Sequence, residues 1–333
     1  MPHGPSQSLL LGLLAALFVA AFLASLLIGP AGLPLSTAFQ ALFSNENPAA
    51  ALVMREIRMP RAILAALIGG TLGLTGAVLQ GFLRNPLADP NILGISSSAA
   101  LGAVLVIYTG LSATFALALP LAAMAGALLA VMVIYTLSGS HAGTLTLILA
   151  GLAISTFAGA MTTLVLNLSP NPYAALEIVY WMLGSLTDRS WTHVLLAAPF
   201  IVVGSLLLAL SARALDALTL GADVAASLGI DLPRTRTLIV LGAAMAVGAA
   251  TAVAGAIGFI GLVVPHVLRP LVGRQPSRLL PASAIAGASL LLLADVAVRL
   301  IAPARDIKLG VLTALIGAPF FVWLVLKTRR EMA

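Results

Sequence analysis

Few residues of this 333-residue chain could perform covalent chemistry. The absence of cysteine excludes a thiolate metal site, a disulfide framework and a cysteine nucleophile. Ser138 or Ser140 beside His141 makes a crude nucleophile and base pair, but one short loop is expected to hold all three, a poor geometry for catalysis. The four histidines show no metal-ligand spacing: His3, His141, His193 and His266. No catalytic residue, metal site or cofactor is therefore predicted, and a hydrolase is the weakest interpretation.

Nucleotide chemistry also lacks its usual sequence signal. The chain has no G-x-x-x-x-G-K-[ST] phosphate loop, so it cannot hydrolyse a nucleotide by that route. Among the charged residues, Asp295 and Arg299 stand four apart, which places them on one helix face as a pair. That pair could be a structural salt bridge or part of a functional site. Arg58 and Arg61 flank Pro60 at the start of a predicted helix; a binding role and simple snorkelling at a membrane surface are both open.

The composition decides which elements position these residues. The chain is 61% hydrophobic and only 8% charged, whereas soluble domains carry about 25% charge. This excludes a soluble enzyme, a nucleic-acid-binding module and a disordered protein. Four stretches contain no Asp, Glu, Lys or Arg: 1–45, 90–176, 237–268 and 309–326. A membrane-spanning helix needs about 20 apolar residues, so the fold class is all-α and polytopic, and the net charge of +6 belongs to cytoplasmic loops.

Nine helices are predicted from the apolar runs, and a short apolar piece at 259–268 is predicted to cross as a half-helix with help from its neighbours. The nine ranges are 8–28, 61–83, 92–108, 113–137, 144–167, 192–211, 237–257, 282–302 and 309–326. About ten crossings put both termini on one side. With the N-terminus in the cytoplasm, inside segments hold ten basic residues and outside segments seven, which agrees with the positive-inside rule. Glycine and alanine along the helices favour a compact bundle in lipid.

Two predicted cytoplasmic segments are unusual. The turn at 84–90 contains Pro86 and Pro90 and cannot continue a helix. The loop at 212–236 contains a short helix bounded by glycines at 218–229, in which Val224 and Leu228 form an apolar stripe. Such a stripe docks onto a partner or packs back onto the chain's own bundle.

Together these segments resemble the FecCD/BtuC-type permease subunits of binding-protein-dependent ABC importers, which take up ferric siderophores, haem and cobalamin. The matching motifs run in family order over nearly the whole chain. They are R-M-P-R at 58–61, R-N-P-L-A-D-P-N-I-L-G at 84–94, L-G-A-D-V-A-A-S-L-G at 220–229, G-A-I-G-F-I-G-L-V-V-P-H-V-L-R at 255–269, L-L-P-A-S at 279–283, A-D-V-A-V-R at 294–299 and I-G-A-P-F-F at 316–321.

The resemblance implies one permease domain of ten transmembrane helices over 1–333, with the coupling loop 212–236 inside it. It implies a pathway lined by two permease copies, two ATPase subunits that supply the missing phosphate loop, and a periplasmic binding protein. It also assigns roles to matching positions: ATPase coupling to Leu220, Gly221, Val224 and Leu228, binding-protein docking to Arg58, Arg61 and Arg299, and the cytoplasmic gate to Asn85, Leu87 and Thr144. One departure is visible: the family's Glu-x-Pro-x-Gly is Asp306-Ile307-Lys308-Leu309-Gly310 here.

The sequence therefore predicts a non-enzymatic, multi-pass subunit of a bacterial inner membrane, with both termini cytoplasmic. We expect a homodimer in contact with lipid, with no nucleic-acid partner, that imports a ferric siderophore or similar metal chelate. Haem and cobalamin are the alternative substrates within the family. Outside the family, the alternative is a stand-alone ion-coupled transporter. The predicted helices lack a mid-membrane acidic residue, which weakens that alternative.

Overall fold

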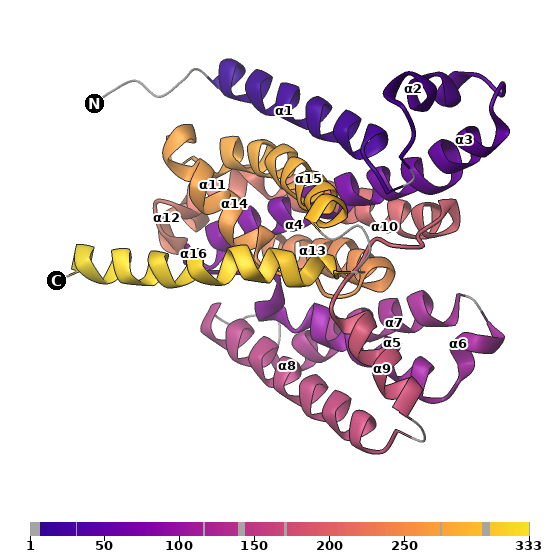
Figure 1. Ribbon diagram of the computed structural model, residues 1–333. Coiled ribbons are helices and arrows are strands. Elements are labelled where there is room, and N and C mark those ends of the chain that lie inside the picture. Colours follow the sequence, from indigo (N-terminus) through magenta and orange to yellow (C-terminus); the bar gives the residue numbers. More distant parts are fainter. Residues whose placement is uncertain are drawn as a thin grey trace.

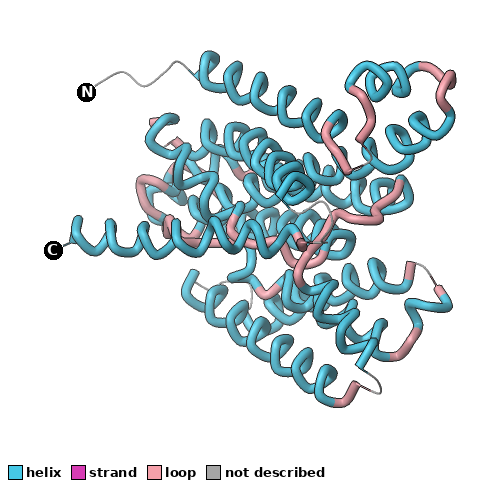
Figure 2. The backbone as a smooth tube through the Cα atoms, viewed as in Figure 1, coloured by secondary structure: helices cyan, strands magenta, loops and turns pink. Residues whose placement is uncertain are grey.

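The computed structural model of the protein describes residues 7–30, 32–115, 117–138, 144–169, 172–273, 275–301 and 307–332. Within these ranges the chain folds almost entirely into helices and contains no strand (Figure 2). Seven helical segments are long and apolar enough to cross a membrane, and three shorter helices are also apolar. Seven and three make ten, the number of crossings that the sequence predicts.

The helices fall into two halves of the chain. The first half contains α1 (Gln7–Leu27), α2 (Leu35–Phe43), α3 (Pro48–Leu52), the π-helix η1 (Val53–Arg58), α4 (Met59–Phe82), the 3-10 helix η2 (Pro90–Leu93), α5 (Ile95–Tyr108), α6 (Leu111–Thr114), α7 (Ala118–Ser138) and α8 (Thr144–Asn167). The second half contains α9 (Pro172–Met182), α10 (Trp191–Leu210), α11 (Ala212–Leu218), α12 (Ala222–Ser227), α13 (Leu232–Ala254), α14 (Ile260–Leu268), the 3-10 helix η3 (Arg269–Val272), α15 (Pro276–Ile301) and α16 (Leu309–Met332).

Most predicted helices agree with the structure within a few residues, and three differences have clear physical causes. The helix predicted over 113–137 is present as α7 but begins five residues later, because extended backbone at Phe115 separates it from α6 and its first turn contains Pro120. Helix α13 begins five residues before the predicted start, because the Asp231 side chain accepts a hydrogen bond from the backbone N–H of Arg234 (2.9 Å) and so caps the helix. Helix α15 begins six residues early at Pro276, where Asp216 accepts from the backbone N–H of Ser277 (2.9 Å).

The centre of the bundle is α4, which packs against α10, α13, α14 and α15. Its contact with α15 depends on glycine: a Cβ atom at Gly69 would collide with the carbonyl oxygen of Gly287, and one at Gly73 with that of Ser283. Without side chains there, the two backbones touch directly. Close backbone packing of this kind replaces the hydrophobic effect as the force that joins helices in lipid.

The predicted half-helix at 259–268 is confirmed as α14. Gly255 and Phe259 have φ angles of 72° and 69°, so the chain leaves α13 through left-handed backbone and then re-enters a helix. Helix α14 lies against α4, and a Cβ atom at Gly76 would strike the backbone of Gly261. In the non-helical backbone at 255–259, Gly255 and Ile257 are buried, and Gly184 packs against the carbonyl group of Ala256, so much of this segment contacts protein, as a membrane requires.

The described ends of the chain lie at one end of the bundle (Figure 1). The first turn of α1 and the last turn of α16 are at the left, with α11 and α12, whereas α2, α3 and α6 are at the right. We name the end with α11 and α12 the inner end and the end with α2, α3 and α6 the outer end, after the predicted orientation. The long helices run between these two ends, and each end carries a distinct set of polar residues.

Candidate functional site

At the outer end, Asp295 of α15 lies between two arginines. Its carboxylate accepts from Arg61 Nη2 at 2.7 Å and Nε at 3.0 Å, and from Arg299 Nη2 at 2.9 Å. The Asp295 side chain is 1% exposed. The predicted Asp295–Arg299 pair is therefore present, and Arg61, which precedes Asp295 by 234 residues, completes a triad.

Arg299 also fastens α1 to the triad. Its Nη1 donates to the carbonyl oxygens of Ser25 (3.0 Å) and Ile28 (2.7 Å), and its Nη2 donates to Ser25 Oγ (2.9 Å). The last carbonyl groups of a helix have no partner inside that helix. A guanidinium satisfies them and also neutralises the negative end of the helix dipole.

Arg58 performs the same function from η1. It is 4% exposed, and its Nη1 donates to the carbonyl oxygens of Leu26 and Leu27, both at 2.9 Å. Its Nη2 is buried without a hydrogen-bond partner. Gly29 leaves room for this group, since a Cβ atom there would lie 2.9 Å from Nη2.

These contacts bear on the prediction that Arg58, Arg61 and Arg299 receive acidic side chains of a binding protein. Arg58 and Arg299 are both buried, and the donors of Arg299 and of Arg58 Nη1 are engaged within the chain, so in this conformation the two residues offer little surface to a partner. Arg61 is the most accessible of the three, with 16% of its side chain exposed. The docking role itself stays a prediction.

Arg55 belongs to the same outer layer, and sequence reasoning gave it no role. Its guanidinium donates to the carbonyl oxygens of Ala41 and Leu42, both at 3.1 Å, near the end of α2. Its own carbonyl oxygen accepts from the indole N–H of Trp191 at 2.9 Å. Arg55, Arg58 and Arg299 thus share one role, which is to donate hydrogen bonds to carbonyl oxygens near helix ends. A surplus of arginine near a predicted helix terminus was the available signal.

The inner end is built differently, from two short helices at 212–227. Gly221 begins α12 with a φ of 109°, which a residue with a Cβ atom adopts only under strain. The apolar side chains around it point outward: Leu220 is 64% exposed, Val224 44% and Leu228 62%. Ala225 on the opposite face is fully buried. Packing of the stripe onto the chain's own bundle is therefore excluded, and an exposed apolar patch remains at the inner end.

The turn after α4 lies at the same end and is held by its own side chains. Asn85 Oδ1 accepts from the backbone N–H of Leu87 at 2.9 Å, and Asp89 Oδ1 accepts from that of Asn91 at 3.0 Å. Asn85 is exposed and Leu87 is half-buried. Burial raises the pKa of Asp89, and the donors of Asn91 partly oppose that effect.

Thr144, the third predicted gate residue, begins α8. Its side chain and residues 139–143, including Ser140 and His141, lie outside the described residues. Farther along α8, Gly151 approaches the turn so closely that a Cβ atom would collide with the carbonyl oxygen of Ile92. The structure therefore brings α8 against the segment that follows Asn85 and Leu87.

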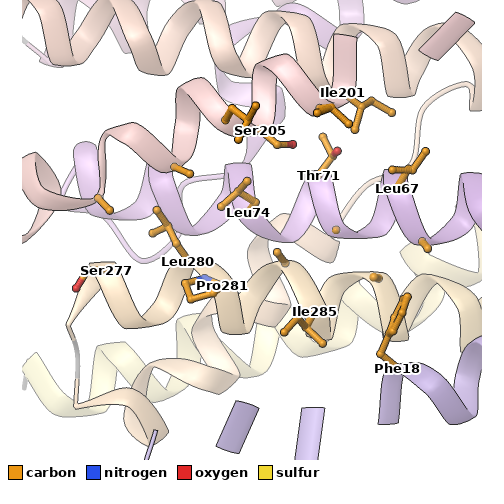
Figure 3. Close-up of a pocket in the computed structure, with 18 residues that line it drawn as sticks. Phe18, Leu67, Thr71, Leu74, Ile201, Ser205, Ser277, Leu280, Pro281 and Ile285 are labelled. Carbon is orange, nitrogen blue, oxygen red and sulfur yellow. The ribbon is translucent and has the colours of Figure 1, made fainter. Parts of the chain in front are cut away.

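A groove of about 710 Å³ lies between α10 and α15, with α4 as its floor (Figure 3). Ile201 and Ser205 lie on one wall, Ile285 and Pro281 on the other, and Thr71 on the floor. No charged residue lines this groove. Such a lining suits hydrocarbon rather than a polar solute. The described residues also contain no cluster of His, Cys, Asp or Glu that could hold a metal ion.

Comparison with known proteins agrees with this arrangement. The model of the FecCD transport family matches residues 17–327. The chain is 40% identical over 328 residues to the hemin transport system permease protein HmuU of Yersinia pestis, covering 97% of each chain. It is 43% identical over 279 residues to the cobalamin import system permease protein BtuC of Halobacterium salinarum, covering 83% of this chain and 74% of that protein.

A solved structure is also similar. An inward-facing conformation of a putative metal-chelate type ABC transporter superposes with a TM-score of 0.85 at 32% identity, covering 95% of this chain and 98% of that one. The match extends over the ends of the bundle as well as the long helices, because almost all of both chains is aligned. The family model, the two permeases and the solved structure all indicate the same family, and the chain therefore belongs to the FecCD transport family.

Proposed function

We propose that this chain is the permease subunit of an ABC importer and forms, with a second copy, the pathway for a ferric siderophore or similar metal chelate. ATP hydrolysis takes place in two separate ATPase subunits, and a periplasmic binding protein delivers the substrate. Both termini and the inner end face the cytoplasm of a bacterial inner membrane. The chain itself makes and breaks no covalent bond.

One observation carries this proposal: the apolar patch of Leu220, Val224 and Leu228 is exposed at one end of the bundle. Apolar side chains that project into water on a short helix are suited to a groove in a partner. A chain without a phosphate loop needs a partner to supply energy, and these side chains are where that partner would seat.

The patch gives a direct test. In a reconstituted complex, Leu228→Asp places a charge in the docking face and Gly221→Arg adds bulk at a left-handed position, so both should abolish ATP-driven uptake. Leu228→Met, which keeps an apolar side chain, is the matched control and should transport normally. Normal uptake by both disruptive variants would remove the basis of the proposal.

The choice of substrate rests on the relatives. Two of the related permeases are named for hemin and cobalamin transport, and the similar solved structure is that of a metal-chelate type transporter. All three are metal–organic complexes, and a ferric siderophore belongs to the same chemical class. Uptake of labelled ferric siderophore, haem and cobalamin through the complete importer, together with the ligand of its binding protein, distinguishes them.

We further propose that the binding protein docks at the outer end through Arg61, assisted by Arg58 and Arg299. Arg61 is partly exposed and already makes a bidentate contact with Asp295. An acidic side chain of the binding protein would share Arg61 with Asp295, while Arg58 and Arg299 keep the site positively charged. Removal of the Arg61 charge should therefore weaken docking and reduce its dependence on salt.

The inner gate is proposed to consist of Asn85, Leu87 and Thr144 from both copies. Residues after the turn pack against α8, so movement of α8 would move the gate. The native chain has no cysteine. Cysteine at position 87 or 144 should therefore cross-link between copies in one nucleotide state only. Cross-linking in every state, or in none, would contradict this gate.

The interpretation outside this family, a stand-alone ion-coupled transporter, makes a different prediction about energy supply. The purified chain in liposomes, with an ion gradient and no ATPase, gives the decisive comparison. Substrate accumulation under those conditions would favour the alternative, and accumulation only with the ATPase subunits and ATP supports the proposal.

A further inference from the structure

The groove between α10 and α15 lies on the side of the bundle away from α8. Helix α8 packs against α5, α7 and η2, whereas α4, α10 and α15 build the groove together with Phe18 of α1. In Figure 1, α8 lies at the bottom of the bundle, and α1 and α15 lie at the top. The proposed gate places the second permease copy beside α8, so the groove faces the surrounding lipid.

The groove has the length of one leaflet of a bilayer. Its lining on α15 runs from Ser277 to Ala288, which is 11 positions (288 minus 277) or about 16 Å along a helix. Half of a hydrocarbon core of about 30 Å is about 15 Å. Ser277, in the first turn of α15, and Phe18 lie at opposite ends of the groove (Figure 3). The groove therefore runs from the inner end of the bundle to about the middle of the membrane.

The walls of the groove are mostly apolar. Ile201 of α10 and Ile285 of α15 lie on opposite walls (Figure 3). Val202 and Leu206, which also belong to the lining, are 48% and 59% exposed, so the groove is open to the side. An extended acyl chain fits such a surface, because it gains close packing contacts and needs no hydrogen-bond partner.

Two exposed arginines stand at the inner mouth of the groove. Ala212 and Ser277 line the groove there, and each is followed directly by an arginine. These arginines, Arg213 and Arg278, are both exposed, and in the described ranges neither forms an ion pair. A positive mouth on an apolar groove is complementary to a molecule with an anionic head and a hydrocarbon tail.

A hydrogen bond between α11 and α15 places the two arginines at one site. Asp216 Oδ1 accepts from the backbone N–H of Ser277 at 2.9 Å. Arg213 precedes Asp216 by three residues and so shares a face of α11 with it. Arg278 adjoins Ser277 on α15. The carboxylate of Asp216 offsets one of the two positive charges, and the remaining one matches the single negative charge of a phospholipid such as phosphatidylglycerol.

We infer that the groove binds an anionic phospholipid of the inner leaflet, with one acyl chain along α4 and the phosphate between Arg213 and Arg278. A guanidinium forms strong, often bidentate hydrogen bonds to a phosphate. Each methylene group of the chain that the groove covers adds to the affinity. The inference rests on the proposed function only for the face that meets lipid, and the permease alone suffices to test it.

The test compares two lipids that have the same acyl chains and different head groups. The purified permease in detergent is titrated with phosphatidylglycerol or with phosphatidylcholine, and the midpoint of thermal unfolding gives the apparent affinity for each. Phosphatidylglycerol should bind roughly tenfold or more tightly than phosphatidylcholine. Inorganic phosphate at the same concentration should leave the midpoint unchanged, because it has no chain for the groove.

Variants at the mouth test the charge. Arg213→Gln and Arg278→Gln should each weaken phosphatidylglycerol binding about fivefold, and the double variant should weaken it roughly thirtyfold. The control is Arg234→Gln, which removes an exposed arginine at the start of α13, a helix that lines no part of the groove. It should alter the affinity less than about twofold.

A change inside the groove tests the acyl chain. Ser205→Trp fills the groove from the wall of α10 and should weaken phosphatidylglycerol binding about tenfold. Val203→Trp, at an exposed position of the same helix outside the groove, is the matched control and should bind normally. The mouth variants change only surface residues, so they keep the test decisive if Ser205→Trp fails to fold.

Three results would overturn the inference: equal affinity for the two lipids, unchanged affinity in the double glutamine variant, or a midpoint shift by inorganic phosphate as large as that by phosphatidylglycerol. None of them affects the proposed function, which is judged by ATP-driven uptake in Leu228→Asp and Gly221→Arg. Normal uptake by those two variants would in turn leave the lipid measurements on the isolated permease unchanged.

Discussion

The two ends of the bundle use arginine in opposite ways. At the outer end, Arg58 and Arg299 are buried and donate to carbonyl oxygens at the end of α1. At the inner end, Arg84 is exposed and forms no ion pair among the described residues. The same residue type therefore has different roles at the two ends of the bundle. What decides the role is whether unsatisfied helix carbonyls lie within reach of the side chain.

The most severe way to disrupt the outer end is to remove the carboxylate shared by Arg61 and Arg299. Asp295→Asn leaves Arg61 and Arg299 close together without a counter-charge, which should cost about 3–5 kcal/mol of stability. Chemical unfolding of the purified protein in detergent measures this. Asp223→Asn, an exposed acid on α12, is the control and should change stability by less than about 0.5 kcal/mol. A loss below about 1 kcal/mol for Asp295→Asn would mean that the triad does not stabilise the fold.

The next largest effect should come from Arg58. Arg58→Gln removes the guanidinium that donates to the carbonyl oxygens of Leu26 and Leu27. Because Arg58 is buried, these carbonyl groups have no other donor to replace it, so we expect the free energy of unfolding to fall by about 1–3 kcal/mol. Helix α1 should also become sensitive to protease before the remaining helices do. If unfolding and proteolysis are both unchanged, the capping role is wrong and Arg58 is free for docking.

A change at Arg61 should affect docking of the binding protein more than the stability of the fold. Asp295 keeps Arg299 as a partner in Arg61→Gln, so stability should fall by only about 1 kcal/mol. Binding-protein affinity should nevertheless fall, and the remaining affinity should depend less on ionic strength. Unchanged affinity at low and high salt would show that the outer arginines serve the fold alone.

The smallest effect on stability is expected at the inner end. Leu228 is 62% exposed, so Leu228→Asp should shift the free energy of unfolding by no more than about 0.5 kcal/mol even though it abolishes transport. Unfolding and uptake measured on the same preparation make the contrast with Asp295→Asn visible. A strongly destabilised Leu228→Asp would mean that the inner patch packs within the permease and that the two ends do not differ in this way.

The sequence predicted long elements better than contacts. Helix α8 coincides with its predicted range because its apolar run is long and ends in polar loops. The short helices α2, α3 and α9 were missed, since elements of 9, 5 and 11 residues give too little periodicity to detect. Helix α15 begins earlier than predicted because its cap comes from Asp216, which lies 61 residues away from Ser277.

The same limit applies to the site residues. The i,i+4 spacing of Asp295 and Arg299 predicted their pairing, because helix geometry alone brings such residues together. No local pattern links Arg61 to Asp295 across 234 residues, or Gln80 to Arg269 across 189. The burial that turns the outer arginines inward arises from the packing of α1 and α15, which only the three-dimensional structure gives.

The central helix α4 has a consequence for the lipid in which the protein works. It is charged at both ends, with Arg61 in its first turn and Arg84 just after its last. These residues are 23 positions apart (84 minus 61), which is about 35 Å along a helix. The hydrocarbon core of a bilayer is about 30 Å thick. Because Arg61 is tied to α15 and the charged Arg84 is exposed at the inner end, a lipid with much longer or shorter acyl chains strains both ends of one rigid helix together. Acyl-chain length is therefore a variable to which uptake should respond even when every protein contact is intact.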